Sequence, residues 1–246
     1  MAAWEFRFPW RPLVQSRILR WSGNIGVVVV ATLMGRVLMP IMPVAAASVA
    51  SERGWGMFNV IGWDGFWAGL AGFVLLDLVI YVQHRAFHAV PVLWRLHRMH
   101  HADTEIDATT GLRFHPIEIV LSLTVKVGAV FAFGISPVAV LLFEVVLNAT
   151  ALFNHGNVKI ADRIDRLLRL FIVTPDMHRV HHSVAPEETD SNFGFNLPWW
   201  DRLFGTYVAQ PAGGLANMTI GLSAFRDARE QRLDRLLAQP FVPERK

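Results

Sequence analysis

The distribution of apolar residues along the chain predicts membrane helices. Nearly uninterrupted apolar stretches cover residues 25–49, 66–82 and 117–153. At 1.5 Å per helical residue the third stretch would be about 55 Å long, whereas a bilayer has a hydrocarbon core of about 30 Å. Gly134, Ser136 and Pro137 supply a turn near its middle. We therefore expect four apolar helices, the last two joined in a hairpin. Each half of the hairpin is short for a full crossing, so tilted or re-entrant insertion stays open.

The loops between these stretches predict the topology. Arg7, Arg11, Arg17 and Arg20 precede the first stretch, and the loop at 51–64 holds one Arg and no Lys. Lys and Arg are enriched in cytoplasmic loops of membrane proteins. With four crossings, the cytoplasmic side receives residues 1–24, 83–116 and 154–246.

The chain divides into three expected parts. Residues 1–24 form a cytoplasmic N-terminal segment, 25–215 a membrane-embedded domain, and 216–246 a polar tail with a helical pattern at 226–237. A cleaved signal peptide ending near the alanines at 45–47 is the alternative for the first stretch, but Arg36 and two prolines interrupt it. At 163–171, arginines alternate with apolar residues. That segment is predicted either to lie on the membrane face or to pack as an ordinary surface helix on the cap.

Composition agrees with a membrane protein. Of the 246 residues 53% are hydrophobic and 17% are charged, and the mean hydropathy is +0.35, which disfavours a soluble enzyme and a disordered chain. The absence of Cys excludes disulfides, thiolate metal sites and Cys nucleophiles. The net charge is +3 and the pI is about 9.8. Without a basic run, this balance favours a membrane surface and predicts no nucleic-acid partner.

Histidines carry the candidate chemistry. All ten lie in the middle of the chain, at His84, His88, His97, His100, His101, His115, His155, His178, His181 and His182. They include one HxxxH pair and two copies of the pattern HRxHH. Residues at i, i+3 and i+4 of a helix project from one side of it, so each box presents a convergent set of imidazoles.

The predicted topology brings these boxes to one level. The HxxxH pair ends the second apolar stretch, His115 precedes the third, and His155 follows the fourth. Buried imidazoles so close together would repel one another if protonated, whereas neutral imidazole binds first-row metals. Ten ligands suit two ions with four or five imidazoles each. Zinc, iron and copper all accept such ligands, and the HExxH pattern of zinc hydrolases is absent.

Other short motifs accompany the boxes. They are Arg113-Phe114-His115-Pro116-x-Glu118, Asn154-His155, Thr174-Pro175-Asp176 before the second HRxHH box, Asn192-Phe193-Gly194, and the run from Trp200 to Tyr207. With the boxes, they make residues 64–207 similar to the fatty acid hydroxylase and sterol desaturase superfamily of integral-membrane non-haem di-iron enzymes.

This resemblance implies a fold, a cofactor and a ligand set. The fold class is all-α: a bundle of about four transmembrane or re-entrant helices, with a cytosolic helical cap that carries the histidine site. Two irons are the implied cofactor, and zinc could replace them in purified protein. The ligands implied by position are His84, His88, His97, His100, His101, His178, His181 and His182. His155 matches a further ligand position. Because Ala151 stands where related lipid hydroxylases often have another His, His115 is the candidate to replace it.

Weaker candidates surround the histidines. Four acids could accept hydrogen bonds from imidazole N–H groups and so orient the rings: Asp103, Glu105, Asp176 and Asp190. Solvated loop charges are the simpler interpretation of these residues. Asn154 could hold a metal-bound water or cap its helix. The arginines at 85, 98 and 179 could pair with acids or with lipid headgroups, and the tryptophans at 199 and 200 could line a lipid entrance or belong to an interfacial belt.

The leading function is O2-dependent oxidation of a C–H bond in a lipid or sterol-like substrate taken from the bilayer. Electrons would come from an external donor of the ferredoxin, cytochrome b5 or reductase type, since no dinucleotide-binding loop is present in the sequence. The alternatives are a non-redox membrane zinc hydrolase or metal-handling protein, and an inactive scaffold. The sequence leaves open hydroxylation or desaturation, and a sterol, fatty acyl, sphingoid, alkylglycerol or carotenoid-like substrate.

Overall fold

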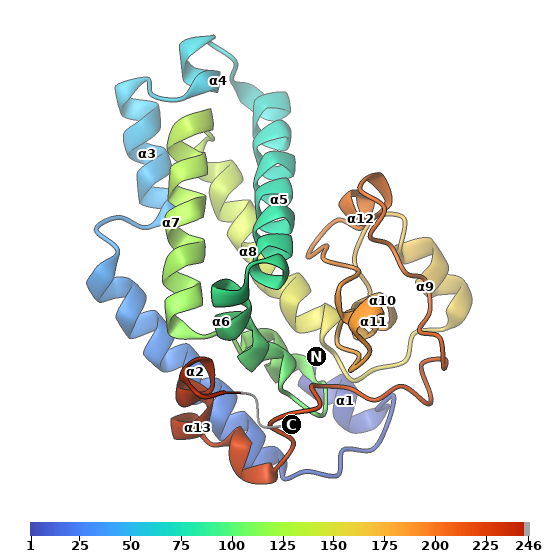
Figure 1. The fold of residues 1–246 in the computed structure, drawn as a ribbon. Coiled ribbons are helices and arrows are strands. Elements are labelled where there is room, and N and C mark those ends of the chain that lie inside the picture. Colours follow the sequence, from blue (N-terminus) through green and yellow to red (C-terminus); the bar gives the residue numbers. More distant parts are fainter. Residues whose placement is uncertain (244–246) are drawn as a thin grey trace.

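The computed structural model describes residues 1–243, and over these residues the chain is helical, with two isolated β-bridges and no strand (Figure 1). The α-helices are α1 Ala2–Arg7, α2 Arg17–Leu38, α3 Pro43–Arg53, α4 Met57–Val60, α5 Gly65–Ala89, α6 Pro91–His101, α7 Pro116–Phe133, α8 Pro137–Asn154, α9 Asp162–Leu168, α10 Pro175–His181, α11 Pro186–Thr189, α12 Trp199–Leu203 and α13 Leu233–Ala238. Three 3₁₀ helices are η1 Ala108–Leu112, η2 Ala228–Gln231 and η3 Gln239–Phe241.

Four helical segments are long and apolar enough to cross a membrane, as predicted. They are Arg17–Val60, which combines α2, α3 and α4, then α5, α7 and α8. In Figure 1 these helices form an elongated bundle, and the N-terminus and α13 lie at its lower end, near α6. Even numbers of crossings return the chain to its starting side, so this arrangement fits four passes.

The first apolar stretch, expected as one helix, is broken at its prolines into α2 and α3. The α2 helix ends at Leu38, and α3 begins with Pro43 in its first turn. Proline lacks a backbone N–H and restricts the residue before it, so it starts a helix more readily than it continues one. Both helices pack on α7, so they lie along the same side of the bundle in spite of the break.

The hairpin between α7 and α8 forms at the predicted turn. Gly134 ends α7 in the left-handed region, at φ 68°. Ser136 caps α8 by accepting a hydrogen bond from the backbone N–H of Ala139, and Pro137 occupies its first turn. At 1.5 Å per residue, 18-residue helices are about 27 Å long. A full crossing and a tilted or re-entrant insertion stay the two alternatives for this hairpin.

The bundle has an apolar core and an apolar outer surface. Buried side chains of α3, α5, α7 and α8, including Leu76, Val130 and Phe143, form the main core. Large apolar side chains also face outward, for example Val29 and Leu33 of α2 and Leu141 and Leu142 of α8. Such an outer surface is unfavourable in water and suits contact with lipid tails.

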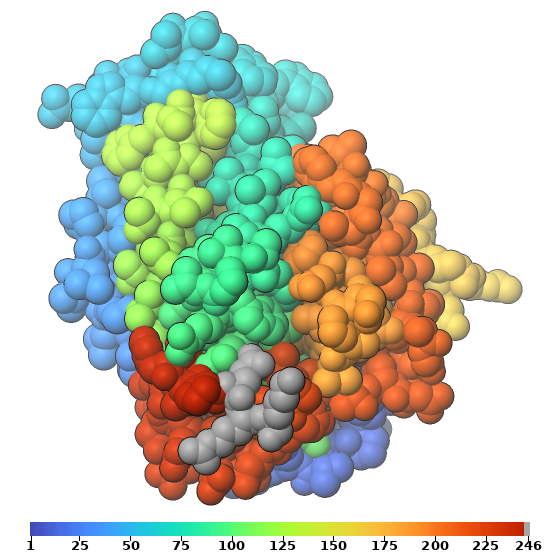
Figure 2. Space-filling model, viewed as in Figure 1, coloured from blue at the N-terminus to red at the C-terminus, as the bar shows by residue number. Residues whose placement is uncertain are grey.

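The lower end of the bundle carries a cap built from distant segments. Arg20, on the first turns of α2, is fully buried and donates to Asp103, 2.9 Å away, and to Asp107. The described part of the C-terminal segment packs on the bundle, since Leu236 of α13 is buried against Val27 of α2 and Met99 of α6. Figure 2 shows the C-terminal segment (red) covering the lower part of this face.

The helical patterns predicted in the cap are shorter in the structure. The pattern at 226–237 becomes η2 followed by α13, separated by Arg232 in an extended conformation. The arginine-rich pattern becomes the seven-residue α9, with Ile164 and Leu167 exposed and Asp165 paired with Arg169 at 2.6 Å. These exposed apolar side chains suit a membrane surface, and membrane contact by α9 stays a prediction.

We predict that Gly134→Ala lowers the free energy of unfolding by about 1–3 kcal/mol, because a non-glycine residue is strained in the left-handed region. The added Cβ would also lie 2.7 Å from Asn59 Nδ2 and from the Trp55 carbonyl oxygen. Thermal unfolding in detergent measures the change. Gly128→Ala in α7 is the control, since its Cβ would have no neighbour within 4 Å. It should leave the melting temperature unchanged or raise it; equal destabilisation by both variants would contradict the prediction.

Candidate metal centre

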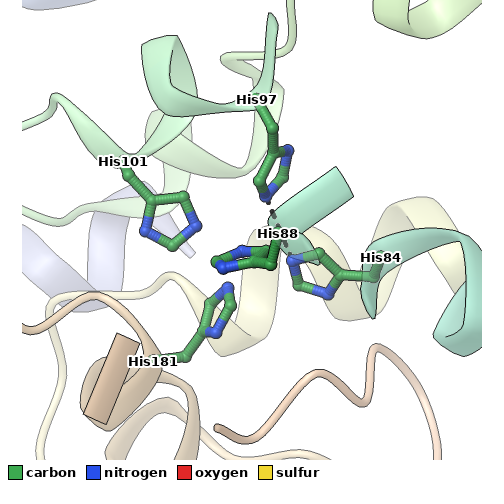
Figure 3. A group of neighbouring side chains, drawn as sticks. All are labelled: His84, His88, His97, His101 and His181. Atoms are coloured by element: carbon green, nitrogen blue, oxygen red, sulfur yellow. Dashed lines mark hydrogen bonds between the residues drawn. The ribbon is translucent and has the colours of Figure 1, made fainter. Parts of the chain in front are cut away.

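Nine of the ten histidines converge on two adjacent positions at the lower end of the bundle. One group has five members, His84, His88, His97, His101 and His181, and the other has four, His100, His155, His178 and His182. In each group, one potential ligand atom per residue lies within 4.8 Å of all the others. Figure 3 shows the five rings of the first group pointing toward a common centre. The division into five and four agrees with the ligand numbers expected for two ions.

Helical spacing explains how the boxes contribute to both groups. His84 and His88 are one turn apart on α5, so both rings enter the five-histidine group. In the first HRxHH box, the residues at 97 and 101 enter that group, whereas the one at 100 points to the four-histidine group. In the second box, only the residue at 181 enters the five-histidine group. Each HRxHH box therefore supplies both positions and ties α6 to α10.

Oxygen atoms behind the rings fix their orientation. The Nδ1 atoms of His84, His181 and His155 lie 2.7–2.8 Å from the carbonyl oxygens of Phe193, Ser191 and Ala151 respectively. Because a carbonyl oxygen can only accept, each Nδ1 carries the proton and donates it. The unprotonated Nε2 then faces the other rings. Metal-binding histidines typically have this arrangement.

Two carboxylates act in the same way on the five-histidine group. His97 Nδ1 donates to Glu118 Oε1 at 2.7 Å, and His88 Nδ1 donates to Asp190 Oδ1 at 3.0 Å. Asp190 was one of the acids proposed from the sequence. No role was predicted for Glu118, although a charged residue in the first turn of an apolar helix is a signal that could have found it.

The inward nitrogen atoms fit metal ions. His155 Nε2 lies 3.1 Å from His100 Nε2 and 3.0 Å from His178 Nε2, so three rings direct nitrogen atoms toward one another. Among residues 1–243, buried ring nitrogens without a hydrogen-bond partner include Nε2 of His88, His101 and His181 and both nitrogens of His182. Unsatisfied buried polar atoms are costly, and coordination to a cation would satisfy them.

Burial keeps the cap histidines neutral, as metal ligands must be. Desolvation, reinforced by neighbouring imidazoles, lowers the pKa well below the usual value for His100, His101, His178, His181 and His182. Desolvation likewise lowers the pKa of His155 to about 4. At neutral pH these rings therefore offer lone pairs and carry no charge.

The structure places His115 outside both groups, which narrows the predicted set of ten ligands to nine candidates. Its Nδ1 accepts a hydrogen bond from the Ile117 backbone N–H at 3.2 Å, and the residue caps α7. Its Nε2 lies 3.4 Å from the Leu237 carbonyl oxygen. Both ring nitrogens thus contact backbone groups and not the other imidazoles.

The other predicted acids contact cations and backbone. Asp103 pairs with Arg20, Glu105 accepts from the backbone N–H groups of residues 14 and 15, and Asp176 pairs with Lys159 at 2.8 Å and with Arg179. In the described residues none of the three bonds an imidazole. They join segments of the cap. Asp103 and Asp176 are buried, so these two fit neither the expected contact with an imidazole nor a solvated loop charge.

The predicted arginines, tryptophans and Asn154 contact backbone carbonyls, an acid and an aromatic ring around the histidines. Arg98 donates to backbone carbonyls of η3 and of residue 242, and Arg179 donates to those of residues 156 and 158. The Arg85 guanidinium lies 5.9 Å from the centre of the Tyr81 ring. The indoles of Trp199 and Trp200 donate to Leu170 O and Asp77 Oδ2, and Asn154 donates to Phe195 O.

A loop after α11 is hydrogen-bonded to α12 beside the five-histidine group. Asp201, buried on α12, accepts from the backbone N–H groups of Phe193 and Gly194, both at 2.8 Å. Burial raises the pKa of Asp201 to about 6. The carbonyl oxygens of this loop orient His84 and His181, so Asp201 positions the group indirectly.

A cavity of about 460 Å³ joins this centre to the membrane helices. His84 and His97 lie at one end of it, and α2, α5, α7 and α8 form its walls. Phe87, Phe114 and Phe195 line it near the histidines. An apolar molecule could therefore reach the centre from within the bundle.

Comparisons with known proteins agree with this centre. Residues 69–206 match the model of the fatty acid hydroxylase family. An alkylglycerol monooxygenase of Xenopus tropicalis is 29% identical over 72% of this chain and 39% of its own length. An ornithine lipid hydroxylase of Rhizobium tropici is 30% identical over 73% of this chain and 52% of its own length. A lathosterol oxidase of Mus musculus is 27% identical over 59% of this chain and 47% of its own length.

The matches cover about two fifths to one half of the length of these relatives. No solved structure matches the chain.

We predict that Glu118→Ala weakens metal binding by the five-histidine group about 10- to 100-fold, because His97 would lose the acceptor that orients its ring. Metal content after dialysis against graded chelator concentrations measures this loss. The four-histidine group should keep its ion. Glu187→Ala on α11, which removes an exposed carboxylate, is the matched control; a wild-type chelation curve for Glu118→Ala would contradict the prediction.

Proposed function

The chain belongs to the fatty acid hydroxylase family, and from this membership we propose that it catalyses the O2-dependent oxidation of a C–H bond in a membrane lipid, using two irons held by nine histidines. The observation that carries the proposal is the position of the two buried histidine groups, one of which contributes His84 and His97 to the lining of a cavity among the membrane-capable helices. The names of the relatives, a monooxygenase, a hydroxylase and an oxidase of lipids, support the same chemistry.

Iron is the metal we propose because the ligand set is made of neutral imidazoles. Such ligands also accept zinc, but two ions in adjacent positions beside an apolar cavity suit oxidation of an unactivated C–H bond better than hydrolysis. When bound, the irons would supply the site of O2 reduction and the oxidant for the substrate. Electrons would come from a separate donor protein of the ferredoxin, cytochrome b5 or reductase type.

The residues of this chain have three tasks in that reaction. The nine histidines hold the ions, and the oxygen atoms behind five of them keep the rings aimed inward. The cavity walls would hold the lipid so that part of its hydrocarbon chain lies beside His84 and His97, which line one end of the cavity. Phe114 and Phe195 border the same end and exclude water, which protects a reactive oxidant from side reactions.

We also propose that the histidine centre faces the cytoplasm. The described chain ends and the cap lie at the same end of the bundle as the centre (Figure 1). Arg7 and Arg17 lie at or before the start of α2, at this end; Arg7 is exposed and Arg17 is half-buried. Excess positive charge on the cytoplasmic side is the usual rule for short segments of membrane proteins.

The proposed function predicts iron-dependent oxidation that requires His155 and tolerates loss of His115. The wild-type protein, purified after expression with iron, should contain two irons per chain. His155→Ala should lose at least one iron and all activity, because two other rings meet His155 at 3.0–3.1 Å. His115→Ala, a buried histidine outside both groups, should keep both irons.

Metal analysis and lipid extracts from cells expressing each variant measure these outcomes. Growth under ¹⁸O2 labels any inserted oxygen, and a gain of one oxygen or loss of two hydrogens separates hydroxylation from desaturation. A product that forms without O2, on a protein holding zinc, would replace this proposal with the non-redox alternative.

A further inference from the structure

The cavity has polar groups at both ends and apolar walls between them. Near the centre it is lined by His84, His97 and Glu118, and at the other end by Arg36, Lys126 and Glu144. Between these ends the walls consist mainly of the side chains of Ala31, Ile80, Leu123, Leu147 and Ala151. A hydrocarbon chain alone would leave the charged end without a partner.

The charged end contains an ion pair inside the membrane bundle. Lys126 Nζ of α7 lies 2.6 Å from Glu144 Oε1 of α8. The Lys126 side chain is 8% exposed and that of Glu144 is 24% exposed. An ammonium group has three donors, and among residues 1–243 Lys126 donates to Glu144 alone. The pair therefore retains hydrogen-bonding capacity on a cavity wall.

Stability does not account for this pair. Charged residues within membrane helices are costly and usually mark a functional site. Replacing a buried ion pair by apolar residues is often neutral or stabilising, so packing of α7 on α8 does not require it. With Arg36, the cavity end carries two cations and one carboxylate. This balance favours a ligand group whose oxygen atoms accept hydrogen bonds.

The distance along α7 relates the pair to the metal centre. Glu118 accepts from His97, and Lys126 lies eight residues further along the same helix. At 1.5 Å per residue this separation is about 12 Å. Both side chains border the cavity. A ligand bound at Lys126 therefore needs an apolar part of about this length to reach the histidines.

We propose that Lys126 and Glu144 bind an oxygen-containing group of the lipid substrate, a carboxylate or a hydroxyl, deep in the bundle. The hydrocarbon part of the substrate then extends toward His84 and His97, and the C–H bond that is oxidised is remote from that oxygen. The statement about oxidation depends on the proposed function, whereas the binding of the oxygen group does not.

The test compares three probes with the same chain length: hexadecanoic acid, 1-hexadecanol and hexadecane. Their dissociation constants are measured on the iron-loaded protein in detergent. The wild-type protein should bind the acid, the alcohol or both at least about tenfold more tightly than the alkane, as a charge-assisted hydrogen bond allows. The two oxygen-containing probes show whether an anion or a neutral hydroxyl is preferred.

The double variant Lys126→Met/Glu144→Gln removes both charges; Gln has the length of Glu, and Met is one atom shorter than Lys. It should bind all three probes with the alkane's affinity, while keeping the wild-type metal content. Lys126→Arg retains a cation and should keep the preference, which also guards against misfolding of the double variant. Lys159→Met removes a lysine that pairs with Asp162 and Asp176 on the cap, and should behave as wild type.

Two results would overturn the inference: equal binding of the three probes by the wild-type protein, or an unchanged preference in the double variant. A preference without any O2-dependent product would leave the binding site intact and contradict the proposed function instead. Where product forms, mass spectrometry should locate the new hydroxyl or double bond far from the oxygen group. Oxidation next to that group would contradict the proposed orientation.

Discussion

The arrangement of the lower half of the protein depends on nine buried imidazoles whose lone pairs face one another. Oxygen acceptors fix the outer N–H of five of these rings, and a cation would satisfy the inner nitrogen atoms. Much of the cap serves to hold these acceptors. Asp201 holds the loop at Phe193 and Gly194, and that loop supplies the carbonyl oxygen behind His84. The position of α12, far along the chain, is thus linked to one ring on α5.

The division of each HRxHH box between the two groups makes the centre cooperative. In the first box, His100 belongs to the four-histidine group and meets His155. In the second box, His181 belongs to the five-histidine group and meets His84 and His88. A shift of α6 or α10 would therefore disturb both positions together. This coupling suits a reaction that needs two metals at a fixed separation, whereas independent sites would place one ligand box at each ion.

Local features were predictable from the sequence because they depend on neighbouring residues. The break before Pro43, the turn at Gly134 and the one-turn spacing of His84 and His88 all follow from backbone geometry. Pairings between distant segments were not predictable in this way. Nothing in the local pattern shows that Arg20 pairs with Asp103 or that His115 caps α7 by accepting from the Ile117 backbone N–H. Periodicity identifies the side of a helix that is buried, and the partner comes from the fold.

The charges within the apolar stretches connect the membrane bundle to the centre. Asp77 of α5 accepts from the Trp200 indole at 2.8 Å, which joins this helix to α12. Glu118 orients His97, and Lys126 pairs with Glu144. Each charge is costly in hydrocarbon, and each has a polar partner on another element. Glu118 and Lys126 border one cavity on one helix, so α7 can fix the distance between the histidine groups and the group that a substrate would bind.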